Sequence, residues 1–247
     1  MLKIAFAGNP NVGKTALINE IAGSKLKVGN WPGVTVEKKE AQFTYENEEI
    51  FLIDLPGVYS LSPYSNEEII TRDYIINENP DLIINVVDAT NLERNLYLTA
   101  LLKELGKPMI IALNLYDEFK KLDYRLDEKQ FEEFFGLNIV KTSARTREGL
   151  EDLLKKAIAM SKEKEKTNFK LHFNSTIDKE VEAIKKEISD KEEFKPVLAK
   201  LSLDYLAVKL LEEDKHLIDV LKNDYKISDV SFTNSYTAKL VKEYDED

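Results

Sequence analysis

The chain has 247 residues, enough for one large or two modest domains, and its 43% hydrophobic and 32% charged residues are typical of a folded globular protein. A net charge of −10 argues against general nucleic-acid binding, and the absence of cysteine excludes disulfides and thiol chemistry. No signal peptide and no apolar run near the ~18 residues of a membrane span is visible, so we expect a cytoplasmic polypeptide.

An apolar strand at residues 2–7 leads into the stretch Gly8-Asn9-Pro10-Asn11-Val12-Gly13-Lys14-Thr15, and a helix follows from Ala16. The pattern G-x-x-x-x-G-K-[ST] between a strand and a helix is typical of a phosphate-binding loop. Its glycines let backbone N–H groups turn toward a phosphate at the open end of the helix. Lys14 is expected to meet the β- and γ-phosphates, and the Thr15 hydroxyl to bind Mg²⁺. Residues 8–16 therefore predict a nucleoside phosphate site.

Residues 24–36 show no periodicity and are expected to form a loop, which contains Gly33-Val34-Thr35. Strands at 37–45 and 49–53 follow, and the second ends in the D-x-x-G element Asp54-Leu55-Pro56-Gly57. Open α/β sheets place ligand groups at such strand ends. We expect Asp54 to hold Mg²⁺ through water, the Gly57 amide to meet a γ-phosphate, and Thr35 to supply a further magnesium ligand. The D-x-x-G element alone could be an ordinary turn, and it becomes informative because the phosphate loop precedes it.

Further strands are expected at residues 81–88, 109–113 and 138–141, alternating with helices at 66–77, 92–105, 127–135 and 148–160. The uninterrupted apolar run in 81–88 fits a central parallel strand that is covered on both faces. The alternation predicts a three-layer α/β domain with a mostly parallel six-stranded sheet.

The ends of the last two strands indicate which base is bound. Asn114-Leu115-Tyr116-Asp117 follows one strand, and Ser143-Ala144 follows the next. The Asp117 carboxylate can accept hydrogen bonds from both guanine N1–H and the exocyclic amine, and adenine has no such pair of donors. Asn114 would tie this loop to the phosphate loop, and the Ala144 N–H would reach the guanine carbonyl. Residues 1–160 thus resemble the Ras-like P-loop GTPase superfamily, which implies GTP and GDP as ligands.

Within that superfamily, Gly29-Asn30-Trp31-Pro32-Gly33-Val34-Thr35-Val36-Glu37 resembles the first switch of the ferrous iron transport protein B (FeoB) family. Residues 54–62, with Ser65, Glu67 and Glu68, are similar to its second switch, and residues 205–214 resemble its helical domain. The resemblance implies a cytosolic GTPase domain, a helical domain that slows GDP release, and a membrane permease region of the same full-length protein. It also places the chain at the cytoplasmic face of the cell membrane, and it leaves self-association open. Leu115 departs from the common N-K-x-D pattern, which implies modest guanine affinity.

Catalysis has to proceed without the glutamine that often follows D-x-x-G, because Val58 stands there and its side chain cannot hydrogen-bond. We therefore expect slow hydrolysis that depends on Lys14, Thr35 and Gly57. Asn11 matches the position at which potassium-activated GTPases place a cation-coordinating amide, so the resemblance also implies K⁺; the alternative is that Asn11 only shapes the turn. Glu67 and Glu68 could position water, or they could be exposed charges on a helix.

Beyond the charged run at 161–166 no strand pattern appears, and spaced apolar residues such as Ile177, Val181, Ile184 and Ile188 predict a small helical bundle. We expect a GTP-binding domain at residues 1–165 and a helical domain at 166–247, whose first helix is capped by Ser175 or Thr176. The two histidines, His172 and His216, each stand alone, so any iron ligands are expected outside this chain.

Two other classes share the nucleotide motifs. One is a soluble GTPase of translation or ribosome assembly, which usually adds a basic RNA-binding module that this acidic chain lacks. The other is a stand-alone GTP switch without a membrane partner. A multi-span region encoded directly after Asp247 would distinguish the transporter interpretation from both.

Overall fold

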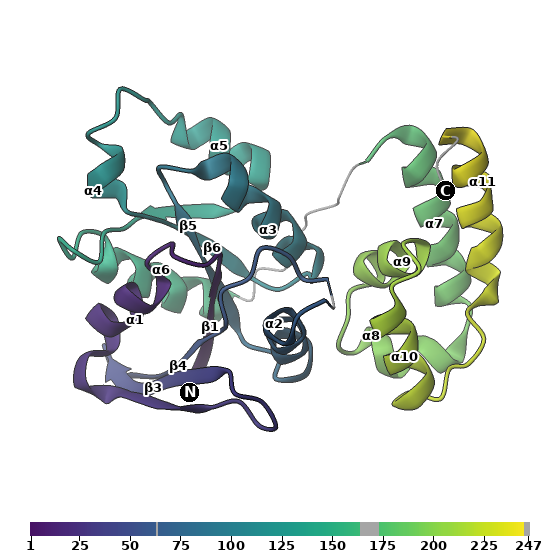
Figure 1. Ribbon diagram of the computed structural model, residues 1–247, viewed down its shortest axis with the longest axis horizontal. Coiled ribbons are helices and arrows are strands. Elements are labelled where there is room, and N and C mark those ends of the chain that lie inside the picture. Colours follow the sequence, from purple (N-terminus) through teal and green to yellow (C-terminus); the bar gives the residue numbers. More distant parts are fainter. Residues whose placement is uncertain (63, 164–172, 245–247) are drawn as a thin grey trace. The chain divides into compact units, whose positions relative to one another are not determined.

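The computed structural model describes residues 1–62, 64–163 and 173–244. It divides into two compact units, one of Met1–Lys103 and Lys107–Asn168, the other of Glu104–Gly106 and Phe169–Asp247 (Figure 1). The expected boundary at residue 165 lies outside the described residues. Each unit has its own secondary structure.

The first unit is built on a seven-stranded sheet in the order β2-β3-β4-β1-β5-β6-β7. Strands β1, β4, β5, β6 and β7 run parallel, while β2 and β3 are antiparallel to their neighbours. The central strands β1, β5 and β6 are almost wholly buried, as expected for parallel strands covered on both faces. The strands are β1 Leu2–Gly8, β2 Leu26–Asn30, β3 Glu37–Tyr45, β4 Glu48–Asp54, β5 Leu82–Asp88, β6 Met109–Asn114 and β7 Asn138–Lys141.

The prediction of six strands and of a loop at 24–36 was wrong at β2. This segment forms the short 3-10 helix η1, Gly23–Lys25, and then an edge strand that pairs with β3 from Leu26↔Ala41 to Asn30↔Glu37. Four of the five residues of β2 are exposed, so the strand has no buried face to distinguish it from a loop. Backbone pairing to β3 defines it, and the sequence pattern carries no sign of that pairing.

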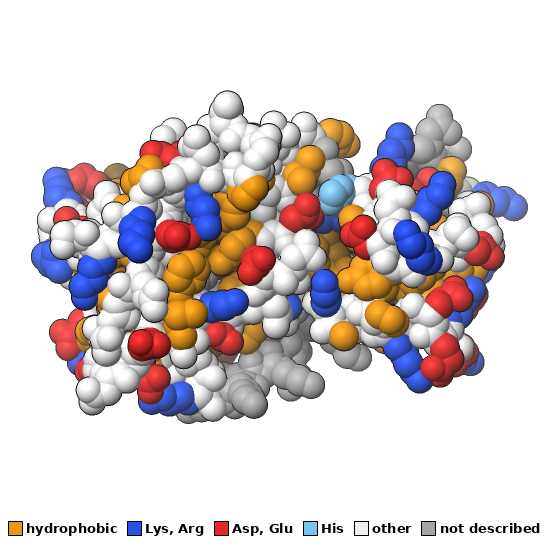
Figure 2. Space-filling view, turned by 90° about the horizontal axis from the view of Figure 1, so that it is seen from below, with side chains coloured by type: hydrophobic (Ala, Val, Ile, Leu, Met, Phe, Trp, Pro, Cys, Tyr) orange, Lys and Arg blue, Asp and Glu red, His pale blue; other side chains and the backbone are white. Residues whose placement is uncertain are grey.

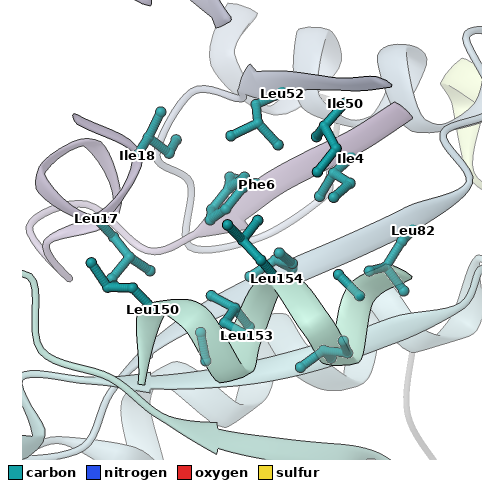
Figure 3. Packing of buried hydrophobic residues seen from close by; sticks show 14 of the residues in the cluster. Ile4, Phe6, Leu17, Ile18, Ile50, Leu52, Leu82, Leu150, Leu153 and Leu154 are labelled. Atoms are coloured by element: carbon teal, nitrogen blue, oxygen red, sulfur yellow. The ribbon is translucent and has the colours of Figure 1, made fainter. Parts of the chain in front are cut away.

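Helices cover both faces of the sheet, which gives the expected three layers (Figure 1). Helices α1 and α6 lie on one face, where apolar side chains of α6 meet those of the sheet and of α1; Figure 3 shows this cluster with Leu150, Leu153, Leu154, Phe6 and Leu17. Helices α2 and α3 lie on the other face. The helices of the unit are α1 Lys14–Ala22, α2 Asn66–Asn77, α3 Leu92–Glu104, α4 Tyr116–Phe119, α5 Glu128–Phe135 and α6 Leu150–Glu163.

The second unit is helical in the part that is described, with α7 and α11 side by side in Figure 1. The apolar face of α7 is centred on Ile184 and Ile188, which are fully buried. Asn174, not Ser175 or Thr176, caps α7, because its Oδ1 accepts from the N–H groups of Thr176 and Ile177 at 3.1 and 3.0 Å. The elements are α7 Ser175–Ser189, η2 Glu192–Phe194, α8 Lys195–Leu198, α9 Leu203–Leu211, α10 Lys215–Asn223, η3 Ser231–Thr233 and α11 Asn234–Tyr244.

Candidate nucleotide-binding site

The loop between β1 and α1 packs so closely that two of its positions admit only glycine. A Cβ at Gly8 would lie 2.5 Å from the Val86 carbonyl oxygen, and one at Gly13 would lie 2.5 Å from Asn114 Nδ2. Gly13 also has φ of 77°, and Asn11 has φ of 66°, the left-handed region that few residue types adopt readily. The backbone turn that the phosphate-loop motif requires is therefore present.

Lys14, Thr15 and Asp54 are brought together at the ends of β1 and β4. The Lys14 Nζ donates to Asp54 Oδ1 and to the Leu55 carbonyl, and the Thr15 hydroxyl donates to Asp54 Oδ2 at 2.8 Å. Burial lowers the pKa of the Lys14 amine, while the carboxylate of Asp54 acts in the opposite direction. A hydroxyl and a carboxylate that share one position are the hard oxygen donors that Mg²⁺ prefers, so the residues fit this ion.

The D-x-x-G turn runs alongside the phosphate loop. Leu55 N–H donates to the Phe6 carbonyl at 3.0 Å, and Val58 N–H donates to the Gly8 carbonyl at 3.2 Å. Between them, a Cβ at Gly57 would come within 3.1 Å of Pro10 Cα, a tight contact that glycine avoids where the two backbones approach closely. Gly57 thus lies against the phosphate loop.

The glutamates downstream of this turn have different environments. Ser65 and Glu68 form a reciprocal cap at the start of α2: the Ser65 hydroxyl accepts from the Glu68 N–H at 3.2 Å, and Glu68 Oε2 accepts from the Ser65 N–H at 3.1 Å. Glu67 is exposed. Glu68 therefore caps the start of α2, whereas Glu67 has no hydrogen-bond partner among the residues that the structure describes.

The first-switch segment closes the turn between β2 and β3. Trp31 N–H donates to the Val36 carbonyl at 2.9 Å, and the buried Trp31 ring meets Tyr74 of α2 edge-on with centroids 5.5 Å apart. Gly33 has φ of 77°, Val34 is half-buried, and Thr35 is exposed. Among the described residues, no hydrogen bond joins Thr35 to Thr15 or Asp54, so the structure does not bring this expected magnesium ligand to the other two.

Asn114 links the base-recognition loop to the phosphate loop. It is fully buried at the end of β6, its Nδ2 donates to the Val12 carbonyl at 2.9 Å, and its Oδ1 accepts from the Thr142 hydroxyl at 3.3 Å. The next residue, Leu115, has φ of 58° and immediately precedes α4 as its N-cap. The Asn114 side chain thus joins the phosphate loop and the base-recognition loop, across 102 residues of sequence.

Asp117 lies beside the Ser143-Ala144 loop, and its partners are polar and positively charged. A hydrogen bond from the Ser143 hydroxyl, and after it the nearby Arg145 guanidinium, holds the pKa of Asp117 below its ordinary value of 3.8. Arg145 Nη2 donates to Asp117 Oδ2 and contacts Glu118 Oε1 at 2.9 Å. The sequence interpretation missed Arg145; its place directly after Ser143-Ala144 was the available signal.

The described residues contain neither a cluster of metal ligands nor a helix suited to a membrane. No group of three or more His, Asp or Glu side chains there is arranged to hold a metal ion, and His172 lies outside the described residues. None of the helices in this part of the chain combines the length and the apolarity that crossing a membrane requires.

Comparison with known proteins gives consistent matches. A family model described as ferrous iron transport protein B matches residues 2–157. A Methanocaldococcus jannaschii protein described as Fe(2+) transporter FeoB is 45% identical over 90% of this chain and 32% of its own length. A Porphyromonas gingivalis Fe(2+) transport protein A/Fe(2+) transporter FeoB fusion protein is 43% identical over 88% of this chain and 26% of its own length. The cytosolic domain of the T. maritima FeoB iron transporter, in its GMPPNP form, has a TM-score of 0.82 and 36% identity over 98% of both chains. The chain spans a third or less of the length of these two curated relatives.

Proposed function

The chain belongs to the ferrous iron transport protein B family, and from this premise we propose that its first unit binds and hydrolyses GTP as the regulatory part of a ferrous iron transporter. One observation carries the nucleotide proposal. The Asn114–Val12 hydrogen bond holds the phosphate loop and the base-recognition loop side by side, so that one ligand can contact both. The related cytosolic domain in its GMPPNP form, a GTP analogue, supports the same ligand.

The phosphate end of the site follows from the loop geometry. Backbone N–H groups within residues 8–16, other than Pro10, would cradle the phosphates at the start of α1, with Lys14 on the β- and γ-phosphates. Thr15 and Asp54 would hold Mg²⁺, Asp54 through water, with Thr35 joining them when the first-switch segment closes. Bound Mg²⁺ would neutralise phosphate charge as the γ-phosphoryl group leaves.

The base end accounts for selectivity. Asp117 would accept from guanine N1–H and the exocyclic amine, and the Ala144 N–H would donate to the guanine carbonyl. The Ser143 hydrogen bond keeps the Asp117 carboxylate oriented and ionised, which this recognition requires. Leu115 supplies only apolar contact where many GTPases carry lysine, so affinity should be modest.

Slow hydrolysis follows from the groups beside the γ-phosphate position. Val58 is buried and apolar, Glu68 is engaged in the cap of α2, and Glu67 is exposed. None of these side chains is placed to orient water in the described geometry. The chemical step would then rest on Lys14, the Gly57 amide and the bound cations.

A potassium ion held by the Asn11 amide oxygen would add positive charge beside the β- and γ-phosphates. An arginine finger that provides such charge in other GTPases contributes ~10³ or more in rate. Asn11 is exposed, with φ of 66°, so its side chain is accessible, although a turn-shaping role requires the same backbone. Hydrolysis rates in matched KCl and NaCl distinguish the two roles. Potassium stimulation that Asn11→Ala abolishes supports the cation site, whereas stimulation that is absent, or that survives Asn11→Ala, refutes it.

Residues 166–247 would form the domain that slows GDP release, and the membrane permease region would lie in the remainder of a longer protein, placing this chain at the cytoplasmic face of the membrane. The alternatives of an RNA-associated GTPase and a stand-alone switch are not favoured, because the family model covers residues 2–157. Acidic and basic side chains are also interspersed over both units on the face seen in Figure 2, where RNA binding would call for a continuous basic surface.

Calorimetric titration of the chain with GTP and with ATP tests the proposal. A polar site whose groups would be left unpaired by the wrong ligand can discriminate by ~10⁴. Strong preference for GTP is expected, and comparable affinities for the two nucleotides would contradict the assignment of the base-recognition loop.

A further inference from the structure

The peptide unit between Pro56 and Gly57 is held from the side of α2. Thr71, on the second turn of that helix, is fully buried, and its hydroxyl donates to the Pro56 carbonyl oxygen at 3.3 Å. We propose that Thr71 is a positioning residue for GTP hydrolysis: it orients the Gly57 N–H toward the γ-phosphate. This inference rests on the proposed function of the site.

The orientation follows from peptide geometry. In a trans peptide the C=O and N–H bonds of one unit point in opposite directions, and the described backbone contains no cis peptide. A hydrogen bond that draws the Pro56 carbonyl toward α2 therefore directs the Gly57 N–H away from α2. Gly57 itself lies against Pro10 of the phosphate loop. The N–H is thus turned away from the helix at the point where the two loops meet.

The neighbouring amides show that the Gly57 N–H is left for a ligand. Leu55 and Val58 donate to carbonyls of the phosphate-loop strand and loop, at 3.0 and 3.2 Å. Within the described part of the chain, no backbone carbonyl accepts from the Gly57 N–H, and the residue as a whole is half-buried. Buried amides are nearly always satisfied, so an amide without a protein acceptor, set between two paired ones, is suited to an anionic oxygen.

Thr71 is suited to hold this peptide rather than its own helix. Threonine hydroxyls within helices often bond to a carbonyl one turn back, but this hydroxyl reaches a carbonyl 15 residues away in sequence. Its β-branched side chain has few rotamers in a helix, and complete burial removes water as a competing partner. Arg72, the next residue, donates to the Leu61 carbonyl at 3.5 Å, so α2 holds the second-switch segment at two carbonyls.

The test compares Thr71→Val, which keeps the shape but removes the hydroxyl, with Thr71→Ser, which keeps the hydroxyl. Thr99→Val is the matched control, because Thr99 is equally buried and accepts from Asn85 Nδ2 at 2.6 Å, on a different helix. Affinities for GDP and GMPPNP are measured by calorimetry, and hydrolysis is measured in single turnover.

We expect Thr71→Val to weaken GMPPNP binding and slow hydrolysis by about tenfold each, a fraction of what removing an oriented donor costs, while GDP affinity changes little. Thr71→Ser should restore most of both losses, and Thr99→Val should leave the ratio of the two affinities unchanged. The proposal is overturned if Thr71→Val affects GDP and GMPPNP equally, leaves both unchanged, or is not rescued by serine. Failure of the wild-type chain to bind either nucleotide would instead overturn the proposed function.

Discussion

Replacing Asn114 with alanine should both destabilise the first unit and separate the two loops that would hold the nucleotide. Asn114 is fully buried, and the substitution removes the partner of the Val12 carbonyl and that of the Thr142 hydroxyl. A buried polar group left unpaired costs about 1–3 kcal/mol, so we expect the free energy of unfolding to fall by about 2–4 kcal/mol.

The matched control is Asn85→Ala. Asn85 is also buried and donates to the Thr99 hydroxyl at 2.6 Å, but it joins β5 to α3 and contacts neither loop. Urea unfolding should show a loss of stability in both variants. Calorimetry with GDP should show a loss of ~10- to 100-fold in affinity only for Asn114→Ala, equivalent to about 1.4–2.8 kcal/mol. Equal GDP affinities in the two variants would refute the reasoning that Asn114 couples the loops.

Three further predictions concern the base loop and the helical unit. Because the pKa of Asp117 lies below its ordinary value of 3.8, the carboxylate stays charged, and its contribution is lost only as pH falls through the lowered value. Affinity for guanosine, which carries no titrating phosphate, should be flat from about pH 8 to pH 5, and a decline centred between 3.8 and 5 would contradict this. Arg145→Ala should raise guanine affinity by up to about fivefold, because the exposed guanidinium competes for Asp117 with an energy typical of surface ion pairs. The control is Arg147→Ala, which removes a similarly exposed arginine paired with Glu20. Equal effects of the two substitutions would show that Arg145 does not compete with the base. Stopped-flow release of a fluorescent GDP analogue should be faster from residues 1–165 than from the full chain, and identical rates would make the helical unit a spacer.

The sequence predicted those parts of the fold in which local pattern and tertiary structure agree. The sequence predicted the strand, glycine loop and helix around Gly8 and Lys14, because each of them needs a particular residue type. It also predicted the buried strand β5, because both faces of that strand are apolar. Strand β2 was missed because only its edge pairing defines it, and no side-chain pattern records pairing. Asn174 was missed as a cap because serine and threonine next to it are equally good candidates by type.

The candidate site, like the fold, was predicted only in part from the sequence. Lys14, Thr15 and Asp54 meet because parallel strands end at one edge of the sheet, a consequence of topology that the order of motifs conveys. The partners of Asp117 were harder to predict from the sequence, because Arg145 reaches Asp117 across a loop whose course depends on packing. The exposed position of Thr35 also depends on how the first-switch segment is held by Trp31, which spacing alone does not reveal.

Recognition of guanine by Asp117 is tested by measuring the affinities of wild type and Asp117→Asn for GTP and for xanthosine triphosphate. Asparagine exchanges an acceptor for a donor at the position that faces N1 and the exocyclic group, and xanthine carries a carbonyl where guanine carries an amine. We predict that wild type prefers GTP and that Asp117→Asn reverses the preference. If the variant keeps the wild-type preference for GTP, Asp117 does not recognise the base, and the account of this site is wrong.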